Sequence, residues 1–202
     1  MATRGHIVAI ATELFTGRGY EATSIETVLE TSGVSRGALY HHFESKEALY
    51  IAVLEVVEAR IADTTAAASR GLRDPREALR AGCNAWIDLS RDPAVRQIVL
   101  LDAPAVIGWQ KWREIDARFA FGQVRAALTN AAKSGRLPLE LVDTLAHILL
   151  AALLEIALVI ARSSDAQAAT RRGRAALDVL LDAIVGESRA IAFRNSKGSR
   201  AT

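Results

Sequence analysis

Residues 23–43 read TSIETVLETSGVSRGALYHHF, two short helical stretches joined by a turn at Gly33. Apolar residues recur at helical spacing on one face of each stretch: Ile25, Val28 and Leu29 in the first, Leu39 and Phe43 in the second. The glycine permits the positive φ that a sharp reversal needs. Two short helices with facing apolar sides predict a helix-turn-helix, the motif that places its second helix in the major groove of DNA.

Hydroxyl residues predict where the helices around this motif begin. Three of them precede the expected helices: Thr23, which has capping-box spacing to Glu26, then Ser35, and then Ser45. We expect the surrounding helices at residues 4–16, 36–43 and 46 to about 69, and the first of them to stop at Gly17 and Gly19. The chain therefore begins with three short helices followed by one long helix.

Beyond residue 71 the pattern remains helical. No segment alternates apolar and polar residues as a half-buried strand does, so we expect an all-α fold of about nine helices. Asp-Pro pairs at residues 74–75 and 92–93 are typical helix starts. Later helices are expected at residues 104–134, 138–162 and 165–185. We divide the chain into a DNA-binding domain at residues 1–48, a larger ligand-binding and dimerisation domain at residues 49–193, and a flexible basic tail at residues 194–202.

Composition excludes several classes of protein. Cys83 is the single cysteine, so neither an intrachain disulfide nor a cysteine zinc cluster is expected. The start of the chain lacks the continuous apolar segment of a secretory signal. The apolar stretch at residues 145–161 is about 17 residues long, just short of a membrane span, and includes Glu155. We expect it to be a buried helix of a cytoplasmic protein with no membrane contact.

A longer stretch resembles a known family. Residues 11–54, ATELFTGRGYEATSIETVLETSGVSRGALYHHFESKEALYIAVL, are similar almost position for position to the N-terminal domain of the tetracycline-repressor (TetR) family. The motifs GYEATS, GVSRGALYHHF and SKEALY carry the resemblance. It implies a ligand-responsive transcriptional repressor, which binds a pseudo-palindromic operator as a homodimer and is released by a small hydrophobic effector. It implies no enzyme activity, cofactor or metal.

The resemblance also assigns roles to residues of the motif. Its base-contacting positions are held here by Arg36, Gly37, Ala38 and His41. Its phosphate-contacting positions are held by Tyr40, His42 and Lys46, with Ser24 and Ser35 as further donors. Chemistry agrees with these roles, since an arginine can pair with guanine and an alanine can meet a thymine methyl. Glycine inside a helix costs about 1 kcal/mol, which close approach to DNA would offset, although a tolerated glycine in a first turn remains the alternative.

The net charge of the first fifty residues predicts modest affinity for DNA. Residues 1–50 contain four Lys or Arg and six Glu, a net charge of −2. The usual basic surface of a DNA-binding protein is therefore missing, and Glu26 stands where some relatives carry a basic residue. We expect moderate, salt-sensitive binding.

Residues of the motif also fit patterns that belong to other functions. The segment GVSRG matches the nucleophile elbow of serine esterases, but that motif needs a strand before it, and helical residues precede it here. His41 and His42 point about 100° apart on a helix and lack a third ligand, which argues against a metal site. Tyr40 and Tyr50 could equally be core aromatics. A helical DNA-binding or dimerisation protein without an effector stays open.

The effector site is less well marked. Aromatic residues cluster between positions 86 and 121, and on a very apolar helix His147 and Glu155 lie two turns apart. Our candidates for ligand contact are Trp86, Trp109, Trp112, Phe119, His147 and Glu155. Ordinary core or interface packing remains the alternative for all six. The last two long helices have wide apolar faces with small residues, which predicts pairing with their copies in a homodimer.

Overall fold

The computed structural model describes residues 4–186. Its helices are α1 (Arg4–Arg18), α2 (Ile25–Ser32), α3 (Arg36–His42), α4 (Lys46–Ser69), α5 (Pro75–Leu89), the π-helical η1 (Val95–Asp102), α6 (Ala103–Val106), α7 (Trp109–Lys133), the 3₁₀ turn η2 (Leu139–Leu141), α8 (Val142–Arg162) and α9 (Ala166–Val185). No strand occurs between residues 4 and 186, so the expected all-α class is confirmed. The expected tail at residues 194–202 lies outside the described residues.

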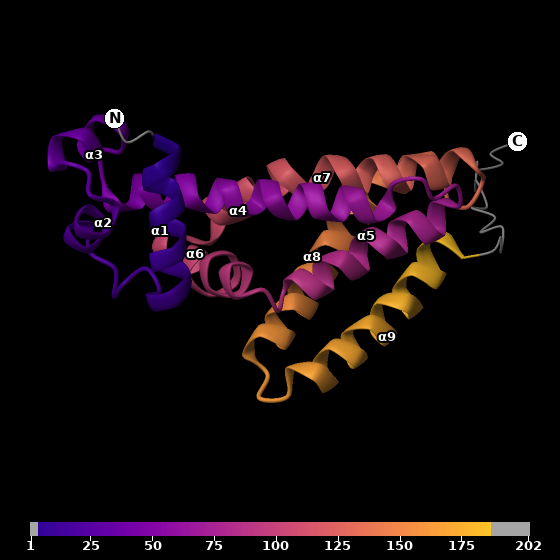
Figure 1. The fold of residues 1–202 in the computed structure, drawn as a ribbon. Helices are drawn as coiled ribbons and strands as arrows, with labels where there is room; N and C mark the ends of the chain where they lie inside the picture. Colours follow the sequence, from indigo (N-terminus) through magenta and orange to yellow (C-terminus); the bar gives the residue numbers. More distant parts are fainter. Residues whose placement is uncertain (1–3, 187–202) are drawn as a thin grey trace, which may run out of the picture.

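The molecule is elongated along α4 (Figure 1). Helices α1, α2 and α3 gather at one end, α4 runs away from them beside α7, and α5, α8 and α9 pack at the other end. Two groups of buried apolar residues form the core. One joins α1–α4 to η1 and the start of α7, and the other joins α5 to α7, α8 and α9.

Most helix starts follow the expected capping chemistry. Ser35 Oγ accepts from the backbone N–H of Ala38, and Ser45 Oγ accepts from that of Ala48. Asp74 caps α5, which has Pro75 in its first turn. Asp92 accepts from the N–H groups of two residues just after Pro93, at 2.9 and 3.1 Å. These contacts satisfy N–H groups that have no partner inside a helix.

The expected capping box at Thr23 is wrong. Ser24, one residue later, caps α2, and its Oγ accepts from the N–H of Thr27 at 3.0 Å. Thr23 is fully buried and its hydroxyl donates to the carbonyl of Gly19 at 2.8 Å. A buried hydroxyl must find a partner, and this nearby carbonyl withdraws Thr23 from the cap.

The single helix expected over residues 104–134 is also wrong. Gly108 has φ of 80°, a left-handed conformation that ends α6, and α7 begins after it. The preceding segment, η1, has the wider i to i+5 hydrogen bonding of a π-helix. Because Pro104 lies inside the first turn of α6, proline is not the start of the long helix.

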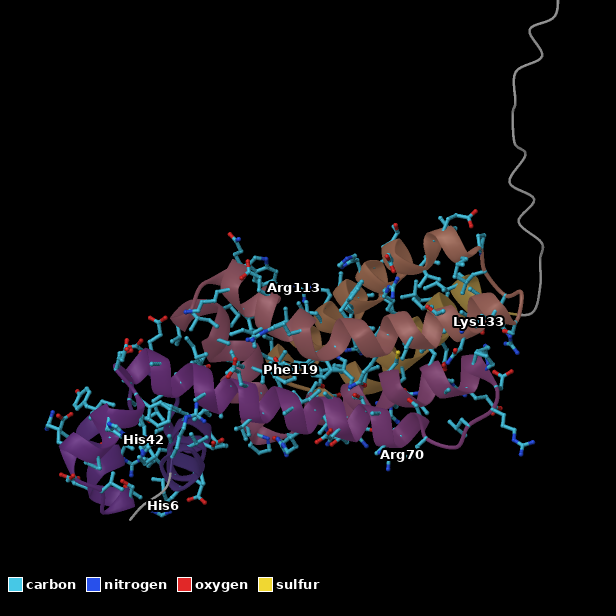
Figure 2. All side chains as sticks on the ribbon, turned by 90° about the horizontal axis from the view of Figure 1, so that it is seen from above. His6, His42, Arg70, Arg113, Phe119 and Lys133 are labelled. Atoms are coloured by element: carbon cyan, nitrogen blue, oxygen red, sulfur yellow. The ribbon has the colours of Figure 1, made fainter. Side chains whose placement is uncertain are left out.

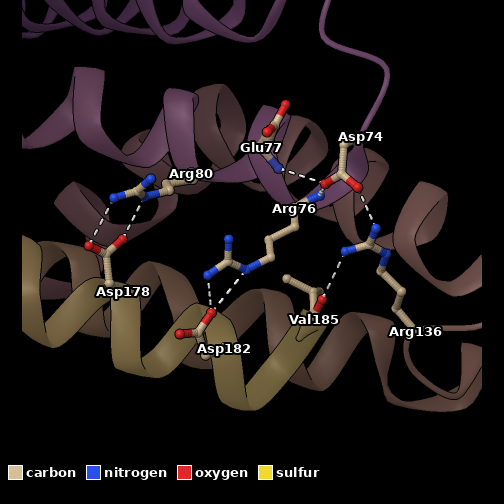
Figure 3. Close-up of polar contacts among 8 residues, drawn as sticks. All are labelled: Asp74, Arg76, Glu77, Arg80, Arg136, Asp178, Asp182 and Val185. Carbon is tan, nitrogen blue, oxygen red and sulfur yellow. Dashed lines mark hydrogen bonds and ion pairs between the residues drawn. The ribbon is translucent and has the colours of Figure 1, made fainter. Parts of the chain in front are cut away.

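Ion pairs fix α9 against α5 (Figure 3). Arg80 donates to Asp178 through Nε at 2.6 Å, and Arg76 pairs with Asp182 one turn further along. Arg174 on α9 pairs in the opposite sense with Asp88 on α5. The alternation disfavours a slip of one turn in one direction, which would place Arg80 against Arg174.

Within residues 4–186, one helical stretch, 139–162, is long and apolar enough to cross a membrane. Half of its most apolar 18-residue segment is buried inside the protein. Ten residues of α8 are buried, in contact with α5, α7, α9 or η1. Such burial is typical of the core helix of a globular domain.

Candidate nucleic-acid interface and ligand pocket

The turn of the helix-turn-helix forms as its sequence predicts. Gly33 adopts φ of 69°, and its N–H donates to the carbonyl of Leu29 at 2.9 Å. Leu39 is fully buried and Phe43 nearly so, which fixes the inner face of α3 against the rest of the domain. The opposite face of α3 is consequently turned to solvent.

The structure brings the proposed DNA contacts together on that outer face and at the adjoining helix ends. Exposed residues are Ser24, Ser35, Arg36, Gly37, Tyr40, His41 and His42, while Ala38 and Lys46 are half-buried. Tyr40 is 43% exposed and Tyr50 is fully buried, which resolves the alternatives left open for the two tyrosines. His42 lies at the far end of the molecule from the α7–α8 connection (Figure 2).

Gly37 has space around it. A Cβ placed on this residue would meet nothing within 4 Å apart from its own helix and neighbours. Internal packing therefore does not require glycine here.

Arg36 is engaged by Glu26 of α2. Its Nη2 lies 2.7 Å from Oε1 of Glu26, and both side chains are more than half exposed. The hydrogen bond from Arg36 lowers the pKa of Glu26, and the reciprocal contact raises the pKa of Arg36. Glu26 is thus the partner of the guanidinium in this structure, through an exposed ion pair of the kind that contributes little to stability.

Lys46 opens α4 beside the α1–α2 connection. Its Nζ lies 4.0 Å from the centroid of the Tyr20 ring, a cation–π contact.

Two hydrogen bonds that the sequence did not predict, from Tyr20 and Tyr50, tie the helix-turn-helix end to η1, and a third, inside η1, orients the acceptor of the first. The Tyr20 N–H donates to Oδ2 of Asp102 at 2.8 Å, and Gln97 donates to Oδ1 of the same carboxylate at 2.9 Å. The buried Tyr50 hydroxyl donates to the carbonyl of Ile98 at 2.5 Å. No local pattern signals the two contacts that cross to η1, since their partners are 82 and 48 residues apart in the sequence.

A cavity of about 90 Å³ lies among α4, α5, α7 and α8. Two of the six candidate ligand residues line it, Trp86 and Phe119. Figure 2 shows Phe119 between the α4 and α7 ribbons. Most of the wall is apolar, supplied by residues such as Ile61, Leu79 and Leu153.

The other four candidates lie outside this cavity. Trp112 is buried in the core beyond it, and Trp109 is 57% exposed with its ring 5.0 Å from that of Trp112. His147 stacks on Phe121 at 4.5 Å and is exposed, as is Glu155. The tryptophans lie in the first turn of α7, before the part of that helix that lines the pocket. The two polar residues lie on the outer face of α8, which is turned away from the pocket.

Two acidic residues of the pocket were missed. Glu58 is 2% exposed and Asp116 is 9% exposed, and both line the cavity. Burial and the charge of Asp116 raise the pKa of Glu58 to about 8. Burial raises the pKa of Asp116, against the opposing effect of Arg113. The sequence did carry a signal, because Glu58 occupies the same face of α4 as Leu54 and Ile61.

The serine of GVSRG does not form a nucleophile elbow. Ser35 caps α3 and is preceded by α2, whereas the elbow requires a strand at that place.

Comparison with known proteins finds two matching sequence profiles. One, described as the Tetracyclin repressor-like C-terminal domain, matches residues 76–184, and one described as bacterial regulatory proteins of the tetR family matches residues 7–53. The HTH-type transcriptional activator FasR of Mycolicibacterium smegmatis is 38% identical over 85 residues, 42% of this chain and 39% of FasR. The match thus spans less than half the length of that relative.

Solved structures share the fold along nearly the whole chain. A TetR-family transcriptional regulator from Pectobacterium atrosepticum superposes with a TM-score of 0.81 and 31% identity, covering 92% of this chain and 95% of that one. SmeT in complex with triclosan gives a TM-score of 0.69 and 26% identity, covering 92% of each chain.

Proposed function

Because the chain belongs to the TetR family of transcriptional regulators, we propose that it is a cytoplasmic repressor that binds a pseudo-palindromic operator as a homodimer. A small hydrophobic effector, bound in the cavity among α4, α5, α7 and α8, releases it. The observation that carries the proposal is the outer face of α3, where exposed polar side chains surround an unobstructed Gly37. A backbone that can approach closely and an arginine beside it suit a major groove.

In this proposal residues 1–48 bind DNA, and residues 49–193 bind the effector and form the dimer. Base contacts come from Arg36, Gly37, Ala38 and His41, and phosphate contacts come from Ser24, Ser35, Tyr40, His42 and Lys46. The side chain of Arg36 exchanges Glu26 for a base on binding. No cofactor or catalytic step enters this function.

Helix α4 supports communication between the two sites. It begins with Lys46 at the DNA end and carries Glu58, Ile61 and Thr65 on the wall of the cavity. The Tyr20–Asp102 hydrogen bond provides a second connection between the domains. A ligand that fits the cavity better when α4 has shifted favours the DNA-free arrangement, and its effect is limited by that difference in affinity.

An apolar surface on α8 and α9 supports the dimer. Ile148 is 49% exposed, Val159 is 52% exposed and Val179 is 72% exposed. Alanines at exposed positions 151, 175, 176 and 183 lie among them and permit close approach of a second helix pair. Paired with its copy, this surface forms a four-helix bundle and removes the apolar groups from water.

Substitutions at Arg36 and Lys46 test the DNA-binding part. Arg36→Ala is expected to weaken binding by about tenfold or more and to relax preference at one base pair per half-site, since arginine reads guanine. Lys46→Ala is expected to weaken binding to all duplexes equally and to lower the salt dependence. Fluorescence anisotropy with an operator library measures both. If Arg36→Ala leaves base preference intact, α3 does not read sequence through this residue.

A further inference from the structure

The lining of the cavity holds acidic groups and no basic group. Its lining includes two carboxyl groups, Glu58 and Asp116, and no Lys, Arg or His. Asp116 has a cation beside it, since its Oδ2 accepts from Nη1 of Arg113 at 2.8 Å. With all three groups ionised, this part of the molecule would hold a net charge of −1.

Glu58 is the residue without a counter-charge. Its Oε1 is buried and has no hydrogen-bond partner within the described part of the chain. On the neighbouring turns of α4, Glu55 pairs with Arg118 and Arg60 pairs with Asp92, so these arginines are engaged elsewhere. The lining residues of α5 and α8 are uncharged, and those of α7 contribute only Asp116. A buried carboxyl of this kind is costly unless it is protonated or paired.

The remaining wall selects against anions and for an apolar body. Gln123, the amide of the lining, already donates to the carbonyl of Ala62 at 3.0 Å and accepts from Thr65 at 3.2 Å. Trp86 and Phe119 present aromatic rings, which attract cations as well as apolar groups. An anionic ligand would meet two carboxyl groups and no free cation among the lining residues.

We propose that this cavity binds an effector with one positive charge on a small apolar body, an organic ammonium, and that Glu58 is its counter-ion. The inference rests on the proposed function, whose effector it assigns to a chemical class. The ammonium takes the place of the missing cation, so that Glu58, Asp116, Arg113 and the ligand together are neutral.

Binding has a proton balance that follows from this charge. In the empty cavity at neutral pH the raised pKa keeps Glu58 mostly protonated. The ammonium favours the carboxylate, so Glu58 loses its proton to the buffer as the ion pair forms. No covalent bond changes, and about one proton is released for each ligand bound.

The test uses matched amines, alcohols and carboxylates on hexyl, octyl and phenethyl bodies. Calorimetry in two buffers of different ionisation enthalpy gives both affinity and proton release. With the unmodified protein we expect at least one amine to bind about tenfold more tightly than its alcohol, equivalent to about 1.4 kcal/mol, and to release a proton. Glu58→Gln is expected to bind that amine about tenfold more weakly and to keep its affinity for the alcohol. It is expected to release no proton on binding.

Glu55→Gln is the matched control. It removes a carboxylate one turn away on α4 that is paired with Arg118 at the surface, so the preference for amines should persist. The inference is overturned if no amine binds, if an alcohol or carboxylate binds as well as its amine, or if proton release is absent from the unmodified protein. The last measurement does not depend on the folding of any variant.

Failure of this inference is distinguishable from failure of the proposed function. Operator binding by the unmodified protein is measured without any probe. If the operator is bound and a neutral compound releases it, the function stands and the charge preference fails. If amines bind selectively but no duplex is bound, the cavity assignment stands and the regulatory function fails.

Discussion

Arg36 serves two partners with one guanidinium. In the free protein it donates to Glu26, and in the proposed complex it must face a base. The carboxylate also adds negative charge close to where phosphates would lie. We therefore expect Glu26 to lower affinity for every duplex and to compete with DNA for Arg36.

Glu26→Gln tests this balance. We expect operator affinity to rise about three- to tenfold at low salt, because repulsion of phosphates is removed. Discrimination between operator and unrelated duplex is expected to persist, since Arg36 leaves Glu26 before it faces a base in the proposed complex. Titrations of both duplexes at two salt concentrations measure the change. Unchanged affinity for both would show that Glu26 lies away from the DNA.

The exposure of single side chains could be predicted from the sequence where polar and apolar residues alternate with the helical repeat. The outer face of α3 was predictable because its apolar residues are four apart, which leaves the remaining side chains outside. The burial of Glu58 was harder to predict, since an acidic residue at a position on the apolar face of a helix does not fit the apolar pattern. Thr23 and Ser24 differ by one position, and only tertiary burial decides which of them caps α2.

Among the elements, α8 and α9 carry the prediction on assembly. Val179→Glu, in the exposed apolar surface of α9, is expected to give monomers at micromolar concentration, because a charge cannot be buried between apolar helices without a partner. Sedimentation measures the effect. Val56→Glu, on the exposed side of α4 and 51% exposed, is the control that should remain dimeric. A soluble monomer in the unmodified protein would contradict the interface.

Element order was largely predictable, but the region around Gly108 was not. Helical periodicity located α4, α8 and α9 within a few residues, because each has a continuous apolar stripe, and an Asp-Pro pair located the start of α5. The π-helical η1 and the break before α7 depend on contacts with distant parts of the chain, such as Tyr50 with Ile98. The cavity was out of reach for the same reason, since four helices contribute to its wall.

For the whole molecule, Glu58 predicts an unusual dependence of stability on pH. Its pKa is about 8 when folded against an ordinary value of 4.5. Between these two values the folded state holds the proton that the unfolded state has lost. Stability should therefore fall as pH rises through this window, by at most about 1.4 kcal/mol per pH unit from this group, and level off above it.

Urea unfolding across this pH range, in the unmodified protein and in Glu58→Gln, measures the contribution. The fall should be smaller in the variant, which retains only the contribution of Asp116, and the variant's advantage in free energy of unfolding should grow toward pH 8. Carboxylates with lowered pKa, such as Asp92, lose their contribution only at more acidic pH and affect both proteins alike. Parallel profiles for the two proteins would show that Glu58 is not a buried acid.

Because α4 is one continuous helix, a rotation of this helix at the cavity displaces its DNA-binding end. Glu58 lies about 12 residues from Lys46, hence about 18 Å along the axis. If α4 pivots by about 5° at the cavity, its DNA end moves by about 1.6 Å. In a symmetric pair the two ends move in opposite directions, and their separation changes by about 3 Å against a half-site spacing of about 34 Å. A rotation of about 5° at the pocket wall is thus expected to change the separation of the two recognition helices by about a tenth of the half-site spacing.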